Sequence, residues 1–301
     1  MMTTDLTAVA NGRTTYTQLG LQFERAHGNT LWVKMRRDPV QAVLNYSFPL
    51  LREMHDMVTS VKEANAHWNH EGTLFPIEYA VMCSDHPEYF NLGGDLKFIR
   101  HCLKQRDRHL LREYALLGLE VMREWTQCGS RTMTTIALVQ GKALGGGFET
   151  AMGADYLIAE EHSVFGFPEV LFGLFPFTGA LQLLSSHVGV HQAERMITNA
   201  RIYTAAELQE MGIVDLVCPK GKGRQAARDF IEGHAKRRRP RLVVQRCRHR
   251  MMDLDEEVML AIVEEWVELA MNMRLEEARA LDMLIMMQGK GDRSLPSLVA
   301  V

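Results

Sequence analysis

The sequence predicts an α/β domain followed by a helical region. Short β-prone runs alternate with segments of helical periodicity over most of the chain, which is the pattern of α/β proteins. A chain of 301 residues, 47% of them hydrophobic, can bury one large core plus a smaller extension. We therefore divide it into a polar N-terminus at 1–15 that is expected to be poorly ordered, a core at 16–235, and a C-terminal helical region at 236–301 that is a candidate for oligomerisation or for covering a pocket.

Each element of the core has a local signal. In order, we expect two short strands around a turn at Gly28–Asn29, a helix from Phe48 to about Ala66, a strand in "PIEYAVMCS" (76–84), a helix that begins at Leu96 with Asp95 as its N-cap, a helix over 108–127, and a buried strand in "TTIALVQG".

The C-terminal region shows two helical segments. "LDEEVMLAIVEEWVELAMNM" is expected to form a helix with an apolar stripe on one side and glutamates on the opposite side; the stripe consists of Val258, Ile262, Trp266, Leu269 and Met273. The second segment, "LEEARALDMLIMMQ", ends at Gly289, a residue suited to a helix C-terminus. The stripe is expected to pack on the core or on a second subunit.

Composition excludes several classes of protein. A net charge of −3 does not suit a general nucleic-acid binder. Five scattered cysteines without a C-x-x-C pair indicate reduced thiols and a cytoplasmic location. The sequence has no uncharged run of membrane-spanning length, and we expect neither a membrane span nor a signal peptide. The histidines near the motifs below have no partner at metal-ligand spacing, so we expect no metal.

The most informative stretch is "TTIALVQGKALGGGFETAM", in which a buried strand leads into a glycine turn and then a helix near Gly147. Glycine allows a tight turn and the close approach of a ligand. The N–H groups at such a helix start have no intrahelical partner and can stabilise an oxyanion. Glu149 falls in the first turn of this helix.

A second carboxylate is expected to return to the same place. The chain runs outward through "DYLIA", turns at 160–163 and comes back through "VFGF", with each run about 17 Å long if extended. Glu169 would then lie near Glu149, as an acid–base pair requires. The alternative is that Glu149 complements the helix dipole and that Glu169 is a loop charge.

"FNLGGDL" provides another glycine turn before a helix, at Leu92-Gly93-Gly94. It could supply a second N–H donor, although Gly-Gly-Asp is also common helix punctuation. The occurrence of two such turns, each after a buried strand, favours a site.

These blocks resemble a known family. "FNLGGDLK", "ALVQGKALGGGFETAM", "ADYLIAEEHSVFGFPEVLFGLFP" and "AAELQEMGIVDLVCP" are similar to consecutive signature blocks of the crotonase (enoyl-CoA hydratase/isomerase) superfamily, from about Leu19 to the C-terminus. The resemblance implies the ClpP/crotonase-like spiral of ββα units with a C-terminal helical region. Within the superfamily, "FNLGGDL", "IAEE" and the late "EEWVELAM" resemble diffusible signal factor synthases, bacterial enzymes that make cis-2-unsaturated fatty acid signals.

The resemblance also implies residue roles. The oxyanion N–H groups fall on Leu92 and Gly146, and the catalytic carboxylates on Glu149 and Glu169. Glu169 would take the α proton of a 3-hydroxyacyl thioester carried on acyl carrier protein, and Glu149 would protonate the departing hydroxyl. Synthases of this group also hydrolyse the thioester. Neither step needs a metal or a redox cofactor.

The expected substrate-binding residues surround these four. They are Gly93, Leu144, Gly145, Leu171, Phe172, Leu174, Phe175 and Phe177. The apolar run "LFGLFPF" suits an acyl chain, because a fatty substrate needs apolar walls, although ordinary core is the alternative. Phe177 departs from the superfamily, which usually has glycine there, and this affects water placement and acyl length. Lys97 matches a lysine of CoA-using relatives, so CoA thioesters remain candidate substrates.

The remaining predictions concern partners. "KRRRPRLVVQRCRHR" (Lys236–Arg250) contains eight Lys or Arg residues. It could bind carrier protein or the phosphates of CoA, but we favour the alternative that it is a solvated helix face. The resemblance implies a homo-oligomer, a trimer or hexamer, and makes a sensor histidine kinase a candidate partner. The rival functions are a plain enoyl-CoA hydratase and a protein whose main role is to bind that kinase.

Overall fold

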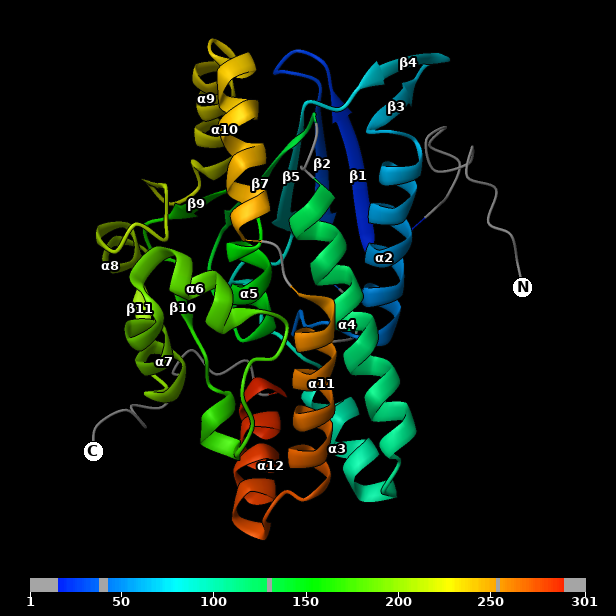
Figure 1. The fold of residues 1–301 in the computed structure, drawn as a ribbon, viewed down its shortest axis with the longest axis vertical. Coiled ribbons are helices and arrows are strands. Elements are labelled where there is room, and N and C mark those ends of the chain that lie inside the picture. Colours follow the sequence, from blue (N-terminus) through cyan, green and yellow to red (C-terminus); the bar gives the residue numbers. More distant parts are fainter. Residues whose placement is uncertain (1–15, 38–42, 129–131, 253–254, 290–301) are drawn as a thin grey trace.

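The structure is a computed structural model that describes residues 16–37, 43–128, 132–252 and 255–289 (Figure 1). The N-terminus predicted at 1–15 lies outside these residues. Two sheets form the centre: a six-stranded sheet in the order β1-β2-β5-β7-β9-β12 and a four-stranded sheet in the order β11-β10-β8-β6. Helices cover both, so the predicted α/β class is confirmed.

The elements have the following bounds. The strands are β1 (Leu19–Glu24), β2 (Thr30–Met35), β3 (His67–His70), β4 (Thr73–Pro76), β5 (Tyr79–Ser84), β6 (Tyr89–Asn91), β7 (Thr134–Val139), β8 (Lys142–Leu144), β9 (Tyr156–Glu160), β10 (Val164–Gly166), β11 (Ile202–Thr204) and β12 (Leu216–Cys218). The helices are α2 (Phe48–Glu63), α3 (Leu96–Gln105), α4 (Arg108–Cys128), α5 (Gly146–Met152), the 3₁₀ helix η1 (Glu169–Phe172), α6 (Ala180–Val188), α7 (Val190–Thr198), α8 (Ala205–Glu210), α9 (Gly223–Ala235), α10 (Arg238–Met251), α11 (Glu256–Met271) and α12 (Leu275–Gly289).

The six-stranded sheet is buried on both faces. Alternate residues of a strand point to opposite sides of the sheet, and both sets of side chains are covered here. In β7, Ala137 and Val139 join the main core with α2, α4 and α5. Ile136 and Leu138 of the same strand join a smaller cluster with Ile231 of α9. Strands β2, β5, β7, β9 and β12 are parallel, and β1 is the antiparallel edge. Parallel sheets require such cover on both faces.

Three consecutive ββα units position the site. Each unit places a long strand in the six-stranded sheet (β5, β7, β9) and a three-residue strand in the four-stranded sheet (β6, β8, β10). Because β6, β8 and β10 are parallel, their carboxyl ends meet at one edge. The segments that follow these strands begin at Leu92, Gly145 and Phe167, so the predicted motifs converge there.

The predicted elements of the core are confirmed, including Asp95 as the N-cap of α3. The β3–β4 hairpin and the four-stranded sheet were not predicted, because their strands are too short for a clear alternation. The chain turns after β9 as predicted, but the return strand β10 is shorter than expected, with three residues, and it lies in the four-stranded sheet.

The described part of the C-terminal region is helical, but the predicted stripe of α11 is rotated. The buried residues are Met259, Val263, Trp266, Val267 and Ala270. Val258 and Leu269, which the stripe included, are 54% and 44% exposed. The glutamates expected to face away instead reach α4: Glu264 pairs with Arg112, and Glu256 with Arg123. This rotation satisfies the apolar contacts and these ion pairs together.

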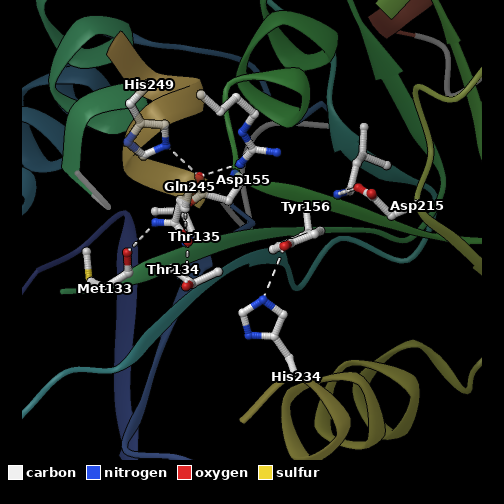
Figure 2. A network of polar contacts seen from close by, with 11 residues as sticks. Met133, Thr134, Thr135, Asp155, Tyr156, Asp215, His234, Gln245 and His249 are labelled. Carbon is white, nitrogen blue, oxygen red and sulfur yellow. Dashed lines mark hydrogen bonds and ion pairs between the residues drawn. The ribbon is translucent and has the colours of Figure 1, made fainter. Parts of the chain in front are cut away.

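The basic run lies mostly on α10, and part of it docks this helix onto the sheet (Figure 2). Arg248 and His249 each lie 2.6 Å from a carboxylate oxygen of the buried Asp155. Burial opposes ionisation of this carboxyl, but the bonds from His249 and Arg248 hold its pKa below the usual range. Gln245 adds bonds to Thr134 Oγ1 and to the Met133 carbonyl, both 2.8 Å. Lys236, Arg237, Arg239 and Arg250 remain exposed.

The sequence predicts neither a membrane span nor a metal site. None of the helices in the described part of the chain is long and apolar enough to cross a membrane. No group of three or more His, Cys, Asp or Glu side chains in that part could hold a metal ion.

Candidate active site

Two glycine turns, one after β6 and one after β8, are in direct contact. Gly93 has a φ of +83°, and a Cβ there would lie 2.8 Å from the Leu144 carbonyl oxygen and 2.9 Å from the Gly146 nitrogen. Only glycine fits this backbone and this gap. The contact brings N–H groups from two separate ββα units to one place.

The hydrogen bonds of these turns decide which N–H groups are available. The Leu92 N–H already donates to the Leu44 carbonyl at 2.9 Å, and the Gly93 N–H donates to Asn91 Oδ1 at 2.8 Å. Within the described residues, the N–H groups of Gly94 and Gly146 have no acceptor, and both residues line the same cavity. The prediction of Leu92 as a donor is therefore corrected to Gly94, whereas Gly146 is free to act.

Two tyrosines hold the first turn in place. The Tyr114 hydroxyl donates to the Tyr46 carbonyl at 2.6 Å and accepts from the Asp95 N–H at 2.9 Å. The Tyr46 N–H donates to the Gly93 carbonyl at 2.8 Å, and the Tyr46 hydroxyl donates to Thr150 Oγ1 at 2.7 Å. The backbone around Gly94 is thus bonded on both sides and linked to α5.

Glu149 lies in α5 and is almost fully buried, with 2% of its surface exposed. Its Oε1 accepts the N–H groups of Thr178 at 2.8 Å and Ala180 at 3.1 Å, which fixes the carboxyl. These bonds come from the segment that follows η1, so they tie α5 to the next part of the fold. Glu149 is a positioned group rather than a surface charge on a helix end.

Glu169 begins η1 and reaches the second glycine turn. The Gly145 N–H donates to the Gly166 carbonyl at 2.9 Å, which joins the end of β10 to this turn. Gly145 has a φ of +53°, and a Cβ there would overlap Glu169 Oε1. Glu169 Oε2 is enclosed and has no hydrogen-bond partner among the described residues. The loop-charge alternative therefore does not describe Glu169.

The two carboxyls have raised pKa values. Burial raises the pKa of Glu149 from 4.5 to about 7, against its bonds to Thr178 and Ala180. Burial and then the charge of Glu149 raise the pKa of Glu169 from 4.5 to about 8. Between these values the pair holds one proton, so one carboxyl can accept a proton while the other donates one.

A cavity of about 130 Å³ opens on both carboxyls and both free N–H groups. Five of the predicted substrate-binding residues line it: Leu144, Phe172, Leu174, Phe175 and Phe177. The other three do not line it within the described chain. Gly93 lies against the turn after β8, Gly145 lies against Glu169, and Leu171 in the 3₁₀ turn is 40% exposed. The cavity also has lining that was not predicted, including Tyr46, Tyr114 and Gly118.

The C-terminal helices complete the cavity. The Phe177 ring packs against Trp266 of α11, with ring centroids 4.5 Å apart, and both side chains line the cavity. Figure 1 shows α3, α11 and α12 at the same end of the molecule, and α12 packs against α3 and η1. Arg100 of α3 holds Asp282 of α12 through two bonds of 2.8 and 2.9 Å.

Sequence reasoning missed Gly94 as a donor, and it missed both tyrosines. "FNLGGDL" did contain Gly94, but only the bond from Leu92 to Leu44 shows which N–H is left free. Tyr46 and Tyr114 lie far from the glycine motifs in sequence and look like ordinary core residues.

Comparison with known proteins decides the family. The family model described as enoyl-CoA hydratase/isomerase matches residues 76–273, which include both glycine turns and both glutamates. The chain belongs to the enoyl-CoA hydratase/isomerase family.

Individual relatives of this family match only part of the chain. A crotonyl-CoA hydratase of Syntrophomonas wolfei is 31% identical over 167 residues, which are 56% of this chain and 58% of that protein. The fatty acid oxidation complex subunit alpha of Vibrio cholerae is 28% identical over 165 residues, 54% of this chain and 22% of that protein. The matches thus cover less than two thirds of either relative.

Solved structures share the family fold over nearly the whole chain. An enoyl-CoA hydratase from Bacillus halodurans has a TM-score of 0.73 at 18% identity, covering 89% of this chain and all of that one. Pseudomonas aeruginosa DspI has a TM-score of 0.61 at 23% identity, covering 91% of this chain and 90% of that one. At these identities the likeness concerns the fold, and it confirms the predicted crotonase-like architecture.

Proposed function

We propose that this enoyl-CoA hydratase/isomerase family protein interconverts a 3-hydroxyacyl thioester and the corresponding 2-enoyl thioester by removal or addition of water. In the direction of elimination, Glu169 takes a proton from C2 while the hydroxyl leaves C3 with a proton from Glu149. The C2–H and C3–O bonds break, the double bond forms between C2 and C3, and water is released. The Gly94 and Gly146 N–H groups stabilise the enolate oxygen of the thioester.

The observation that carries this proposal is the convergence of two carboxyls with raised pKa values and two free backbone N–H groups on one cavity. Elimination next to a thioester needs a base, an acid and an oxyanion site, and each has a candidate here. Apolar walls beyond the pair suit a fatty acyl chain. No metal or redox cofactor takes part in the proposed steps.

A second candidate is a diffusible signal factor synthase, which would also hydrolyse the thioester and release a free cis-2-enoic acid. The observation that favours it is the resemblance of "FNLGGDL", "IAEE" and "EEWVELAM" to those enzymes. The family match and the named relatives favour plain hydratase chemistry on CoA thioesters. Both functions share the site described above and differ in the fate of the thioester.

Product analysis separates these two candidates. The purified protein is incubated with 3-hydroxyacyl-CoA and, separately, with 3-hydroxyacyl carrier protein, and the products are identified by mass spectrometry. A hydratase is expected to give an equilibrium of hydroxyacyl and enoyl thioesters with no free acid. A synthase is expected to release free cis-2-enoic acid from the carrier protein. Neither product should form with the double variant Glu149→Gln/Glu169→Gln, and absence of both with the parent protein would refute the proposal.

The pH dependence of kcat/KM follows from the two pKa values. Between these values the proton of the pair lies mainly on Glu169, which is the state that hydration needs: ionised Glu149 accepts a proton from water and protonated Glu169 donates one to C2. Hydration is therefore expected to follow a bell-shaped profile with its maximum between about pH 7 and 8. Initial rates at low substrate concentration, measured from pH 5.5 to 9.5, check this. A flat profile across that range would contradict the assigned roles.

The remaining partners stay predictions. Acyl carrier protein, a sensor histidine kinase and a homo-oligomeric assembly are implied by the resemblance, and each requires a binding or sedimentation experiment.

A further inference from the structure

Gly118 is an unusual residue for its place in the fold. It lies in the interior of α4, a 21-residue helix, where its neighbours in "YALLGLEV" are mostly good helix formers. Glycine in such a position lowers helix stability relative to alanine. Its backbone does not require glycine, since its φ is not in the left-handed region. A Cβ on Gly118 would have no neighbouring atom within 4 Å among the described residues.

The open space at Gly118 belongs to the cavity of the candidate active site. Tyr114, Gly118, Val121 and Met122 all line it and share one face of α4, because Gly118 lies four residues after Tyr114 and three and four residues before Val121 and Met122. The cavity therefore follows α4 over eight residues, or about 12 Å. One end is fixed by Tyr114, whose hydroxyl would lie 3.6 Å from a Cβ on Gly94. The other end is Met122, which contacts Gly153 just after α5.

The chemistry of the cavity changes along this path. The two free N–H groups lie toward the end marked by Tyr114, because the Tyr114 hydroxyl is next to Gly94, and Gly146 lies against Gly93. Gly118 comes one helical turn later on α4 and is followed by Val121 and Met122, whose apolar side chains also line the cavity. A thioester held at the polar end would direct its acyl chain along α4 and across Gly118.

We propose that Gly118 is a specificity-determining residue, whose missing side chain leaves room for the acyl chain of the thioester and so sets the chain length that the site accepts. The inference rests on the proposed function and adds the part of the substrate that α4 recognises. A side chain at position 118 fills space that the acyl chain needs, and its Cβ would have no atom of the carboxyls or of the N–H donors within 4 Å.

The test compares Gly118→Ala and Gly118→Leu with a matched control, Gly233→Ala. Gly233 is also a glycine within a helix, α9, and also has no neighbour within 4 Å of a Cβ, but it is exposed and does not line the cavity. For each protein, kcat/KM is measured with 3-hydroxyacyl-CoA substrates of four, eight and twelve carbons, and Tm is measured by calorimetry. Binding of saturated acyl-CoA of the same lengths is measured in parallel.

Each excluded methylene is expected to lower kcat/KM and affinity about fourfold, which follows from about 0.8 kcal/mol per buried methylene. Gly118→Ala should lower kcat/KM for the longest substrate about fourfold relative to the four-carbon substrate, while its Tm rises as in Gly233→Ala. Gly118→Leu should lower kcat/KM for the longest substrate by about two orders of magnitude. Gly233→Ala should raise Tm with no change in the profile of chain lengths.

If folded Gly118 variants show the same dependence of kcat/KM on acyl-chain length as the parent protein, the inference is overturned. If the leucine variant does not fold, the alanine variant decides. Failure of the proposed function gives a different result. In that case the parent protein turns over no substrate, but chain-length-dependent binding of saturated acyl-CoA and its loss in the Gly118 variants still test the role of Gly118.

Discussion

Glu169→Gln is expected to lower kcat/KM for water elimination by about 10³-fold, because the substitution removes the general base. The stability of the fold should change in the opposite direction at high pH. Burial and the charge of Glu149 raise the pKa of Glu169 to about 8, so ionised Glu169 destabilises the folded state. A raised pKa contributes stability that is present below the unfolded value near 4.5 and is lost as the pH rises through about 8. Glutamine does not ionise, and the variant should therefore resist urea better than the parent at pH 9 but not at pH 4.

Glu149→Gln is the matched control for this experiment. It removes the other carboxyl while leaving Glu169 as a base, so exchange of the C2 proton of a bound thioester with D₂O should continue although elimination stops. Glu169→Gln should abolish both. Proton exchange that survives in Glu169→Gln, or that disappears only in Glu149→Gln, would reverse the assigned roles.

Gly93→Ala is expected to lower kcat/KM by about 10²- to 10³-fold, the range for loss of an oxyanion donor. The new Cβ would lie 2.8 Å from the Leu144 carbonyl and 2.9 Å from the Gly146 nitrogen, so it must push the two glycine turns apart. Because both neighbours are backbone atoms, no flexible side chain can move aside. The free energy of unfolding should also fall, by about 1–3 kcal/mol.

Gly72→Ala separates the cost of backbone strain from the effect of pushing the two glycine turns apart. Gly72 has nearly the same backbone angle, with φ of +84° against +83° for Gly93, but a Cβ there would have no neighbour within 4 Å among the described residues. Urea unfolding of this variant should show the backbone cost alone, and its kcat/KM should equal that of the parent. Equal activity of Gly93→Ala and Gly72→Ala would mean that contact between the turns is not needed.

The features that the sequence predicts well depend on local chemistry. The turn Gly145–Gly147, the two glutamates and the N-cap Asp95 can each be recognised within a few residues. The convergence of Glu149 and Glu169 was also predicted, from the similar lengths of an outward and a return run. The structure adds what pattern did not include: β10 joins a second sheet beside β8, and their shared direction brings Glu169 to Gly145.

The remaining features depend on contacts between distant segments. Leu92 looked like the donor because its N–H lies in the right motif, and only the bond to Leu44 removes it. The buried face of α11 is the one that packs against α4, where Glu264 and Glu256 also meet Arg112 and Arg123, and pattern alone does not include this partner helix. Gly118 looks like a weak point in a helix until the cavity beside it is known.

The packing of α12 against η1 has a consequence for the timing of catalysis. Glu169 begins a helix of only four residues, and short elements open locally at low free energy unless their neighbours hold them. Glu277 of α12 covers Gly173, where η1 ends, and the Arg100–Asp282 pair anchors α12 itself. The time for which Glu169 stays in position as the base therefore depends on how long α12, a helix more than 100 residues later in the chain, stays packed against η1.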